Sequence, residues 1–456
     1  MNYEPSHHLP VGRRIVSREA RVAVVGLGYV GLPLALTAHD AGFDVTGVDL
    51  DPERVARIMQ GAQVISYLAP DRISGAVASG RFRATQDNAA LSEADVILIC
   101  VPTPLTPDQE PDMRFVSAAA RQIAPHLRQG QLVVLESSVW PGATSTLVRP
   151  LLEAGGLTAG RDFFLGFSPE REDPGNKTFD THNIPKVVGA DDPQSRELIE
   201  EFYRAIITRA VPVSSSATAE AVKLVENSFR TVNIALVNEL KVALDAMGVD
   251  IWEVIDAAAT KPFGFMPFYP GPGIGGACIP VSPAYLSWRA ADVGSATPLI
   301  DLARHSNDSV PALLAARIAA GLVARTRATA SDPQTPLTGQ RILLVGIAYK
   351  RDVEDTRRSP ALVLLEQLEN LGAEVDYHDP FFPRLPAGGE FPALAGRQSV
   401  PLTPETLERY AAIAVITDHS APDYQLIASH AALIFDSRNV FARQGITVSD
   451  DRLIKV

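Results

Sequence analysis

The feature that most constrains the fold of this 456-residue chain is a glycine pattern that joins an apolar run to a helical pattern. Gly26, Gly28 and Gly31 fit Gly-x-Gly-x-x-Gly directly after the apolar residues 21–25. In such a turn the first glycine permits the tight bend, the second lets the backbone reach a pyrophosphate, and the third allows close packing of helix on strand. The phosphates then lie at the helix N-terminus. The pattern predicts a dinucleotide-binding domain, with a purely structural glycine turn as the alternative.

An acidic residue supports the dinucleotide interpretation. Asp49 ends the next apolar run, where its carboxylate can accept hydrogen bonds from ribose hydroxyls. A carboxylate there repels a 2′-phosphate, which favours NAD over NADP, although Arg54 could hold a phosphate or cover the adenosine. We also expect Tyr29 and Val30, which lie between the second and third glycines, to contact the cofactor.

Apolar runs alternate with helical patterns in the first and last parts of the chain, which predicts parallel sheets covered by helices. The expected strands are residues 21–25, 44–48, 95–100, 132–135, 163–167, 341–345, 374–377, 411–416 and 432–435. Between the two parts, apolar residues spaced three to four apart predict one long helix over 217–247. Further helices are expected at 32–41, 115–127, 252–260, 284–292 and 310–328. The predicted fold is two Rossmann-like, doubly wound α/β domains joined by a long central helix and a helical region.

We divide the chain into four segments on these patterns. Residues 1–18 mix His, Pro, Arg and Glu without periodicity and are expected to form a flexible arm. An NAD-binding domain (19–212), a central helical domain (213–330) and a C-terminal α/β domain (331–456) follow. The last domain begins with a turn-rich linker.

Composition excludes several classes of protein. The net charge of −12 argues against a general nucleic-acid or membrane-surface binder. The sequence has no apolar stretch of about 18–20 residues and no signal-peptide core. Its two cysteines cannot form a disulfide framework, so we expect a cytoplasmic protein. Cys100 lies within an apolar run and is expected in the core.

The other cysteine, Cys278, ends a glycine-rich segment at residues 270–280. Four glycines in six residues (Gly271, Gly273, Gly275 and Gly276) suit a loop that approaches another group closely or adopts positive φ. A thiol on such a loop is accessible and is a candidate nucleophile. A thiol together with a hydride acceptor can oxidise an aldehyde through a thioester.

Several motifs, taken in order, resemble those of the UDP-glucose/GDP-mannose dehydrogenase family. They are the glycine turn, Cys100-Val-Pro-Thr-Pro104, Glu136-Ser-Ser-Val-Trp-Pro-Gly142, Ser168-Pro-Glu-Arg171, Lys223 with Asn227, the Cys278 loop and residues 346–360. Segments 168–175 and 261–273 look most like the UDP-N-acetylglucosamine 6-dehydrogenase branch.

The resemblance implies oxidation of the C6 alcohol of a UDP-sugar to a carboxylate with two NAD⁺. Cys278 would form the thiohemiacetal and then the thioester, and Lys223 would favour the thiolate and stabilise oxyanions at C6. Asn227 lies one helical turn after Lys223 and could complete the oxyanion site. A solvated helix face is the alternative for both residues, because Glu220 and Glu226 are near them in the sequence.

The resemblance implies roles for further residues as well. Glu170 would act as acid–base or substrate-positioning group, and Ser138 would hold the hydrolytic water and contact the cofactor together with Pro102 and Thr103. A helix-capping role is the alternative for these hydroxyls. Beyond the central helix, the resemblance implies that Arg357 binds NAD. The residues that it implies for substrate binding are Glu170, Lys223, Asn227, Tyr269, Gly275, Lys350 and Arg438.

The chain departs from the family pattern beside its nucleophile. Ala277 replaces a frequent His, and Ser282 replaces an expected Asp, which is thought to activate the hydrolytic water and balance the lysine. A serine cannot hold that negative charge. We therefore expect a more positive pocket that favours the Cys278 thiolate but slows thioester hydrolysis.

Two other functions stay open at this stage. One is a two-electron dehydrogenase that stops at the aldehyde or acts on a smaller hydroxy acid. The other is a catalytically weakened homologue that binds NAD and a UDP-sugar. We predict no metal site and no macromolecular partner except a second copy of the chain, paired through the central helix as a dimer or higher oligomer.

Overall fold

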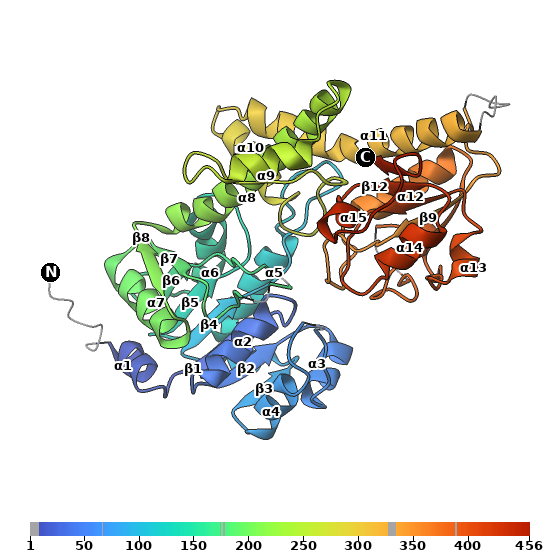
Figure 1. The fold of residues 1–456 in the computed structure, drawn as a ribbon. Helices are drawn as coiled ribbons and strands as arrows, with labels where there is room; N and C mark the ends of the chain where they lie inside the picture. Colours follow the sequence, from blue (N-terminus) through green and yellow to red (C-terminus); the bar gives the residue numbers. More distant parts are fainter. Residues whose placement is uncertain (1–8, 66, 174, 177, 327–333, 388–389) are drawn as a thin grey trace. The chain divides into compact units, whose positions relative to one another are not determined.

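The computed structural model describes residues 9–65, 67–173, 175–176, 178–326, 334–387 and 390–456 (Figure 1). The chain divides into two compact units, Met1–Asn227 with Ala284–Ala296, and Ser228–Pro283 with Thr297–Val456. The division falls within the helices α8 (Ser216–Ala246) and α10 (Ser282–Asp292). The segment predicted as a central domain is therefore shared between the two units.

The first unit is built on an eight-stranded sheet in the order β3-β2-β1-β4-β5-β6-β7-β8. Its strands are β1 (Arg21–Val25), β2 (Asp44–Val48), β3 (Phe82–Thr85), β4 (Val96–Ile99), β5 (Leu132–Leu135), β6 (Phe164–Phe167), β7 (Lys186–Ala190) and β8 (Ala210–Val213). All neighbouring strands pair in parallel except β6 and β7. The five predicted strands are confirmed. The sequence analysis did not predict β3, β7 and β8; β3 and β8 are the edge strands of the sheet, and β7 is the neighbour of β8.

Helices connect these strands as the alternation predicts. In the first unit they are α2 (Gly31–Asp40), α3 (Pro52–Met59), α4 (Arg72–Ala78), α5 (Arg114–Ile123), α6 (Arg149–Glu153) and α7 (Pro193–Ile206). Every residue of α2 before its last is buried, because this helix lies between the sheet and its neighbours. The chain lays down β2 and β3 on one side of β1 and then β4 to β8 on the other side. Ligands of doubly wound sheets bind at such a switch point, outside the carboxyl ends of the strands.

The predicted flexible arm is wrong for residues 10–18. Helix α1 (Pro10–Val16) buries Ile15 and Val11 and packs against α7. Arg14 on α1 also forms an ion pair with the buried Asp95 at 2.8 Å. Two apolar residues four apart are enough to anchor a helix of seven residues but too few to give a clear periodic pattern. Residues 1–8 of the predicted arm lie outside the described residues.

The second unit contains a parallel five-stranded sheet in the order β10-β9-β11-β12-β13. Its strands are β9 (Arg341–Val345), β10 (Glu374–His378), β11 (Ala412–Val415), β12 (Ile434–Asp436) and β13 (Leu453–Lys455). Its remaining helices are α9 (Ile251–Ala259), α11 (Pro298–Thr326), α12 (Pro360–Asn370), α13 (Pro404–Leu407), α14 (Tyr424–His430) and α15 (Val440–Arg443). The two sheets with their helices make both α/β domains Rossmann-like, as predicted.

The long helix over residues 217–247 is confirmed as α8, but α11 is longer than predicted. Its start was expected at residue 310, whereas the helix begins at Pro298 and continues through Pro311. Within the second unit, apolar side chains of these two helices are exposed: Phe229, Leu236 and Leu240 on α8, and Leu299, Leu302 and Leu313 on α11. No helix among the described residues is both long and apolar enough to cross a membrane.

Candidate functional site

The glycine turn after β1 has the geometry that a pyrophosphate requires. Gly26 has φ of 91°, and a Cβ on it would lie 2.5 Å from the carbonyl oxygen of Cys100. A Cβ on Gly31 would lie 1.8 Å from the carbonyl oxygen of Gly26, so the helix can pack on the turn only with glycine there. A Cβ on Gly28 would meet nothing within 4 Å, which leaves open space beside the backbone. The turn therefore fits the phosphates of a dinucleotide.

Asp49 is held at the end of β2 against this turn. Its Oδ2 accepts a hydrogen bond from the Leu27 N–H at 2.7 Å, and its Oδ1 accepts one from the Asp51 N–H at 3.0 Å. Arg54 forms an ion pair with the same carboxylate at 3.2 Å. The acidic group expected to bind the ribose is thus fixed by the backbone, and Arg54 contacts Asp49 directly.

The other residues predicted to contact the cofactor lie around the turn. The Tyr29 ring stacks on that of Tyr67, whose hydroxyl donates to the Tyr29 carbonyl, and Val30 is the residue before α2. Pro102 and Thr103 follow β4, and Pro102 is exposed. All four residues lie in segments next to the carboxyl ends of β1 and β4.

The hydroxyl of Ser137, next to the predicted Ser138, joins two of these segments. The Ser137 hydroxyl donates to the carbonyl of Val101 at 2.8 Å and accepts from the Val101 N–H at 2.9 Å. Ser138 itself is half-buried, and neither Ser138 nor Thr103 caps a helix, since the next helical segments begin at Thr144 and Arg114. The helix-capping alternative is therefore wrong for both residues.

Lys223 and Glu170 form a buried ion pair, with Nζ and Oε2 3.0 Å apart. Lys223 comes from α8 and Glu170 from the segment after β6. Asn227, one turn further along α8, is buried too, so the alternative of a solvated helix face is wrong for both helix residues. Glu170 also balances the charge of Lys223 within the first unit. In the family pattern that role belongs to an aspartate, which Ser282 replaces in this chain.

A second buried ion pair, which the sequence did not predict, lies behind Glu170. Lys186 at the start of β7 donates to Glu136 at 2.5 Å and to the carbonyl of Pro169 at 3.1 Å. Tyr203 donates its hydroxyl to the same carboxylate. Burial raises the pKa of Glu136, and the charge of Lys186 opposes that rise. Through Pro169, Lys186 fixes the backbone immediately before Glu170.

Arg171 ties the segment around Glu170 to α8. Its guanidinium contacts Glu226 on α8 at 2.5 Å and donates to the carbonyl of Pro185 at 2.6 Å. Because Glu226 lies between Lys223 and Asn227 in the sequence, this pair helps to set the rotation of α8 over the segment after β6.

In the second unit, Cys278 is exposed on a loop that is built against the C-terminal domain. The Gly276 N–H donates to the Arg357 carbonyl at 2.9 Å, and a Cβ on Gly275 would lie 2.5 Å from the Tyr349 Cβ. Such close approach explains why glycine occupies these positions. The Cys278 carbonyl accepts from the N–H of Ser282 at 2.9 Å, and this turn leads into α10 with Ser282 buried.

Aromatic and cationic side chains anchor the loop before Cys278. The Arg443 guanidinium lies 4.6 Å from the ring centre of Tyr269 and 4.8 Å from that of Trp252. The Tyr269 hydroxyl donates to Asp256 at 2.6 Å. Among these residues the sequence analysis predicted a role only for Tyr269. The contacts of Tyr269 and Trp252 with Arg443 join residues far apart in the chain, which a sequence pattern does not indicate.

Arg438, predicted to bind substrate, lies where the glycine loop meets the C-terminal sheet. Its Nε contacts Asp418 at 3.1 Å, and a Cβ on Gly271 would be 2.5 Å from its Nη1. The glycine therefore leaves room for the guanidinium. Lys350 is half-buried in the segment after β9, and Arg357 forms an ion pair with Asp355 at 2.5 Å. The contacts of Lys350 with a substrate and of Arg357 with NAD remain predictions.

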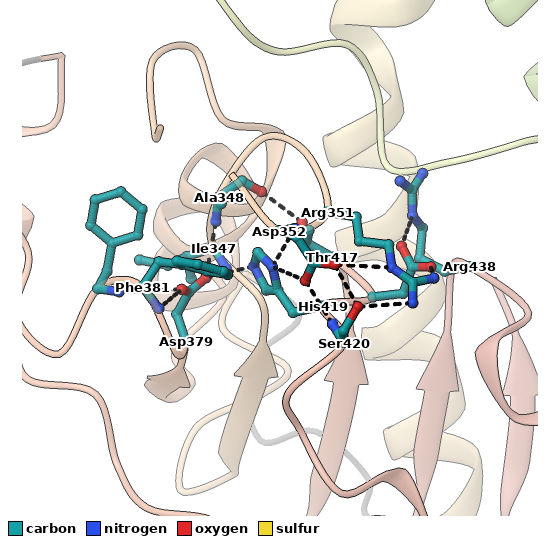
Figure 2. Close-up of polar contacts among 12 residues, drawn as sticks. Ile347, Ala348, Arg351, Asp352, Asp379, Phe381, Thr417, His419, Ser420 and Arg438 are labelled. Atoms are coloured by element: carbon teal, nitrogen blue, oxygen red, sulfur yellow. Dashed lines mark hydrogen bonds and ion pairs between the residues drawn. The ribbon is translucent and has the colours of Figure 1, made fainter. Parts of the chain in front are cut away.

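The C-terminal domain repeats the turn of the first domain, but a buried histidine binds its carboxylate. Asp379 ends β10, as Asp49 ends β2, and accepts from the N–H groups of Ile347 and Ala348 at 2.7 and 3.1 Å (Figure 2). It also accepts from Nε2 of the fully buried His419 at 3.1 Å. Burial opposes ionisation, but the His419 hydrogen bond and charge hold the pKa of Asp379 below its ordinary value. Asp379 therefore holds the fold rather than a ribose.

The first domain has the turn and carboxylate of a dinucleotide-binding domain, and the second unit carries an exposed thiol beside another Rossmann-like domain. These features define a dinucleotide-dependent oxidoreductase. The chain belongs to the UDP-glucose/GDP-mannose dehydrogenase family. Residues 20–207 match its NAD binding domain, 217–309 its central domain and 343–443 its UDP binding domain. The enzyme is thus an NAD-dependent member of a family of UDP-sugar dehydrogenases.

Individual relatives support the same assignment. The chain is 36% identical over 366 residues to UDP-N-acetyl-D-glucosamine 6-dehydrogenase of Pseudomonas aeruginosa, which covers 80% of this chain and 83% of that protein. It is 33% identical over 429 residues to UDP-N-acetyl-D-mannosamine dehydrogenase of Pyrococcus horikoshii, covering 92% and 96%. A solved structure of UDP-D-ManNAc dehydrogenase from Pyrococcus horikoshii has a TM-score of 0.81 at 32% identity, covering 92% and 96%. A UDP-glucose dehydrogenase from Pyrobaculum islandicum also gives 0.81, at 26% identity and 95% and 98% coverage.

Proposed function

We propose that the enzyme oxidises the C6 alcohol of UDP-N-acetylglucosamine to the uronic acid in two steps. The exposed Cys278 carries this proposal, because a hydride acceptor alone oxidises the alcohol only to the aldehyde, whereas a thiol can take the aldehyde on to a thioester. The sugar is chosen from the 36% identity to UDP-N-acetyl-D-glucosamine 6-dehydrogenase. UDP-N-acetylmannosamine is the second candidate, since several relatives carry that name.

When bound, NAD⁺ supplies the hydride acceptor, one equivalent for each oxidation. In the first step C6 loses a hydride and its hydroxyl loses a proton, with Glu170 as the proposed proton acceptor. The Cys278 thiolate then adds to the aldehyde carbon, and the Lys223 ammonium and Asn227 amide stabilise the resulting oxyanion. Loss of a second hydride restores the C=O bond as a thioester.

Water then adds to the thioester, the C–S bond breaks, and the thiolate leaves as the carboxylate forms. The net reaction converts one alcohol, one water and two NAD⁺ into one carboxylate, two NADH and three protons. Ser138 would hold the attacking water. Ser282, in place of a carboxylate, would leave this hydrolysis as the slow step. The Lys223–Glu170 pair supports the assignment of the proton and oxyanion roles, because the two groups are buried together 3.0 Å apart.

We propose further that two copies of the chain associate through α8. The exposed apolar side chains Phe229, Leu236 and Leu240 support this, because a monomer rarely leaves several large apolar groups along one helix in water. Sedimentation of the purified protein tests the proposal, and a monomer at micromolar concentration would contradict it.

A panel of UDP-sugars tests the substrate. The initial rate of NADH formation is measured with UDP-N-acetylglucosamine, UDP-N-acetylmannosamine, UDP-N-acetylgalactosamine and UDP-glucose at equal concentration. We expect the highest kcat/KM with UDP-N-acetylglucosamine. A higher value for any other sugar would contradict the substrate assignment without affecting the reaction class.

A further inference from the structure

A cavity of about 340 Å³ lies in the first unit, away from the glycine turn. Its lining includes Arg18, Asp40, Arg72, His182 and Arg204. Residues at the C-terminal end of α2 line it, whereas the glycine turn precedes the N-terminal end of the same helix, about 15 Å away at 1.5 Å per residue. The cavity is therefore separate from the cofactor site. Its volume falls in the lower part of the range of small-molecule pockets.

Arg18 is an unusual residue for its place in the fold. It follows α1 by two positions and has φ of 66°, a left-handed conformation that a Cβ makes unfavourable. Glycine is the usual residue there. Seven other described helices do have glycine with positive φ at this position: Gly42, Gly61, Gly80, Gly248, Gly294, Gly372 and Gly445. The chain thus places an arginine where glycine would be more stable, which indicates that its side chain has a use.

The guanidinium of Arg18 has no carboxylate partner among the residues that the structure describes. It donates to the Ile15 carbonyl at 3.3 Å and lies 5.1 Å from the centre of the Phe43 ring. Burial lowers its pKa. The other two arginines of the cavity differ, because Arg72 pairs with Asp40 at 3.0 Å and Arg204 pairs with Glu200 at 2.5 Å. The lining therefore contains one positive charge that no acidic side chain offsets.

Two further guanidinium groups and an imidazole line the cavity together with Arg18. His182 donates from Nδ1 to the Ile206 carbonyl at 3.1 Å, so Nε2 of the neutral ring is an acceptor and offers an anion no N–H group. The cavity thus offers guanidinium groups from three segments, since Arg18 follows α1, Arg72 lies on α4 and Arg204 lies on α7.

We propose that this cavity binds a small molecule through a phosphate group, with Arg18 as the main contact. A guanidinium presents a fork of N–H donors that matches phosphate oxygens, and a tetrahedral phosphate can accept from Arg18 and its neighbours together. The alternative is that Arg18 merely caps α1 through the Ile15 carbonyl. That role predicts no response to phosphate.

Thermal unfolding of the full chain tests the proposal. NADH and UDP are kept saturating so that the phosphate sites of cofactor and substrate are filled, and sodium chloride holds the ionic strength constant. Inorganic phosphate and ribose 5-phosphate are titrated separately, with ribose as the neutral control. The variants are Arg18→Gly, Arg18→Gln and the matched control Arg13→Gln, which removes an exposed arginine from the same helix outside the cavity.

We expect the Tm of the unaltered protein to rise saturably with ribose 5-phosphate or with phosphate itself. Arg18→Gly should raise the Tm without ligand by about 2 °C, because the backbone strain is relieved, and should weaken the apparent affinity at least tenfold. Arg18→Gln should weaken it similarly, and Arg13→Gln should leave it unchanged. Tighter binding of ribose 5-phosphate than of inorganic phosphate would identify the ligand as a sugar phosphate or nucleotide. Equal binding of the two would identify the ligand as the phosphate ion. No saturable rise in the unaltered protein, or affinities of both Arg18 variants within twofold of it, would overturn the proposal.

Discussion

Replacing Lys186 by methionine should destabilise the first domain strongly, because the change leaves Glu136 buried without its charge partner. The Lys186 ammonium is 2.5 Å from a carboxylate whose side chain has no exposed surface, and it also donates to Pro169. Breaking a buried ion pair by removing one partner costs about 3–5 kcal/mol. With roughly 2–4 °C lost per kcal/mol in a domain of this size, the Tm should fall by roughly 10 °C.

The penalty should depend on pH in a definite direction. Burial already holds the pKa of Glu136 above its ordinary value, and Lys186 opposes that rise. Without Lys186 the pKa rises further, so the folded protein binds a proton that the unfolded chain has released. Stability then falls as pH rises from the unfolded pKa, about 4.3, towards the higher folded pKa. The deficit of Lys186→Met should accordingly be smaller at pH 5 than at pH 8.

Differential scanning fluorimetry at pH 5, 6.5 and 8 measures this effect. The matched control is Lys186→Met with Glu136→Gln, which removes both charges and keeps an acceptor for Tyr203. The double variant should be more stable than Lys186→Met alone at pH 8 and should lose the pH dependence. A single variant within 1 °C of the unaltered protein at pH 8, or a deficit that grows towards pH 5, would refute the reasoning.

Three further changes test other parts of the site. Ser282→Asp should speed release of the acid in single-turnover experiments, because a carboxylate can activate the hydrolytic water; release no faster than in the unaltered enzyme would contradict a slow hydrolysis. Asp49→Asn should raise the KM for NAD⁺ about tenfold or more with a smaller change in kcat, since hydrogen bonds to charged groups contribute about 1.5–3 kcal/mol; an unchanged KM would exclude Asp49 from ribose binding. Because the pKa of Asp379 is lowered in the folded protein, its ionised carboxylate stabilises the fold at neutral pH, and this stabilisation is lost as the pH falls through that lowered pKa. Asp379→Asn should therefore lower the Tm at pH 7 but much less near pH 3. An equal loss of Tm at both pH values would contradict this role.

Local patterns were enough to predict both sheets and the turn at Gly26, because buried parallel strands are continuous apolar runs and the glycine turn is a contiguous motif. Of the strands that were not predicted, β3, β8 and β13 lie at sheet edges, and β7 is the neighbour of β8. Helix α11 was predicted to start too late because Pro311 suggests a helix start, whereas the helix continues through it.

The site was predictable where its functional residues belong to one contiguous segment, as in the loop that ends at Cys278. The supporting contacts were not. Lys186 and Glu136 are 50 residues apart, and His419 and Asp379 are 40 apart, so each pair exists only after the sheet has formed. Short spacing patterns carry no information about such pairs, although an isolated charged residue at the end of an apolar strand, as at Glu136, is a usable signal.

The number of NADH molecules formed per UDP-sugar consumed tests the central claim most directly. With limiting UDP-N-acetylglucosamine and excess NAD⁺, the account predicts two NADH per sugar at completion. Cys278→Ser should give no more than one, because the aldehyde can no longer form a thioester. One NADH per sugar in the unaltered enzyme, or two in the Cys278→Ser variant, would contradict the four-electron mechanism through Cys278.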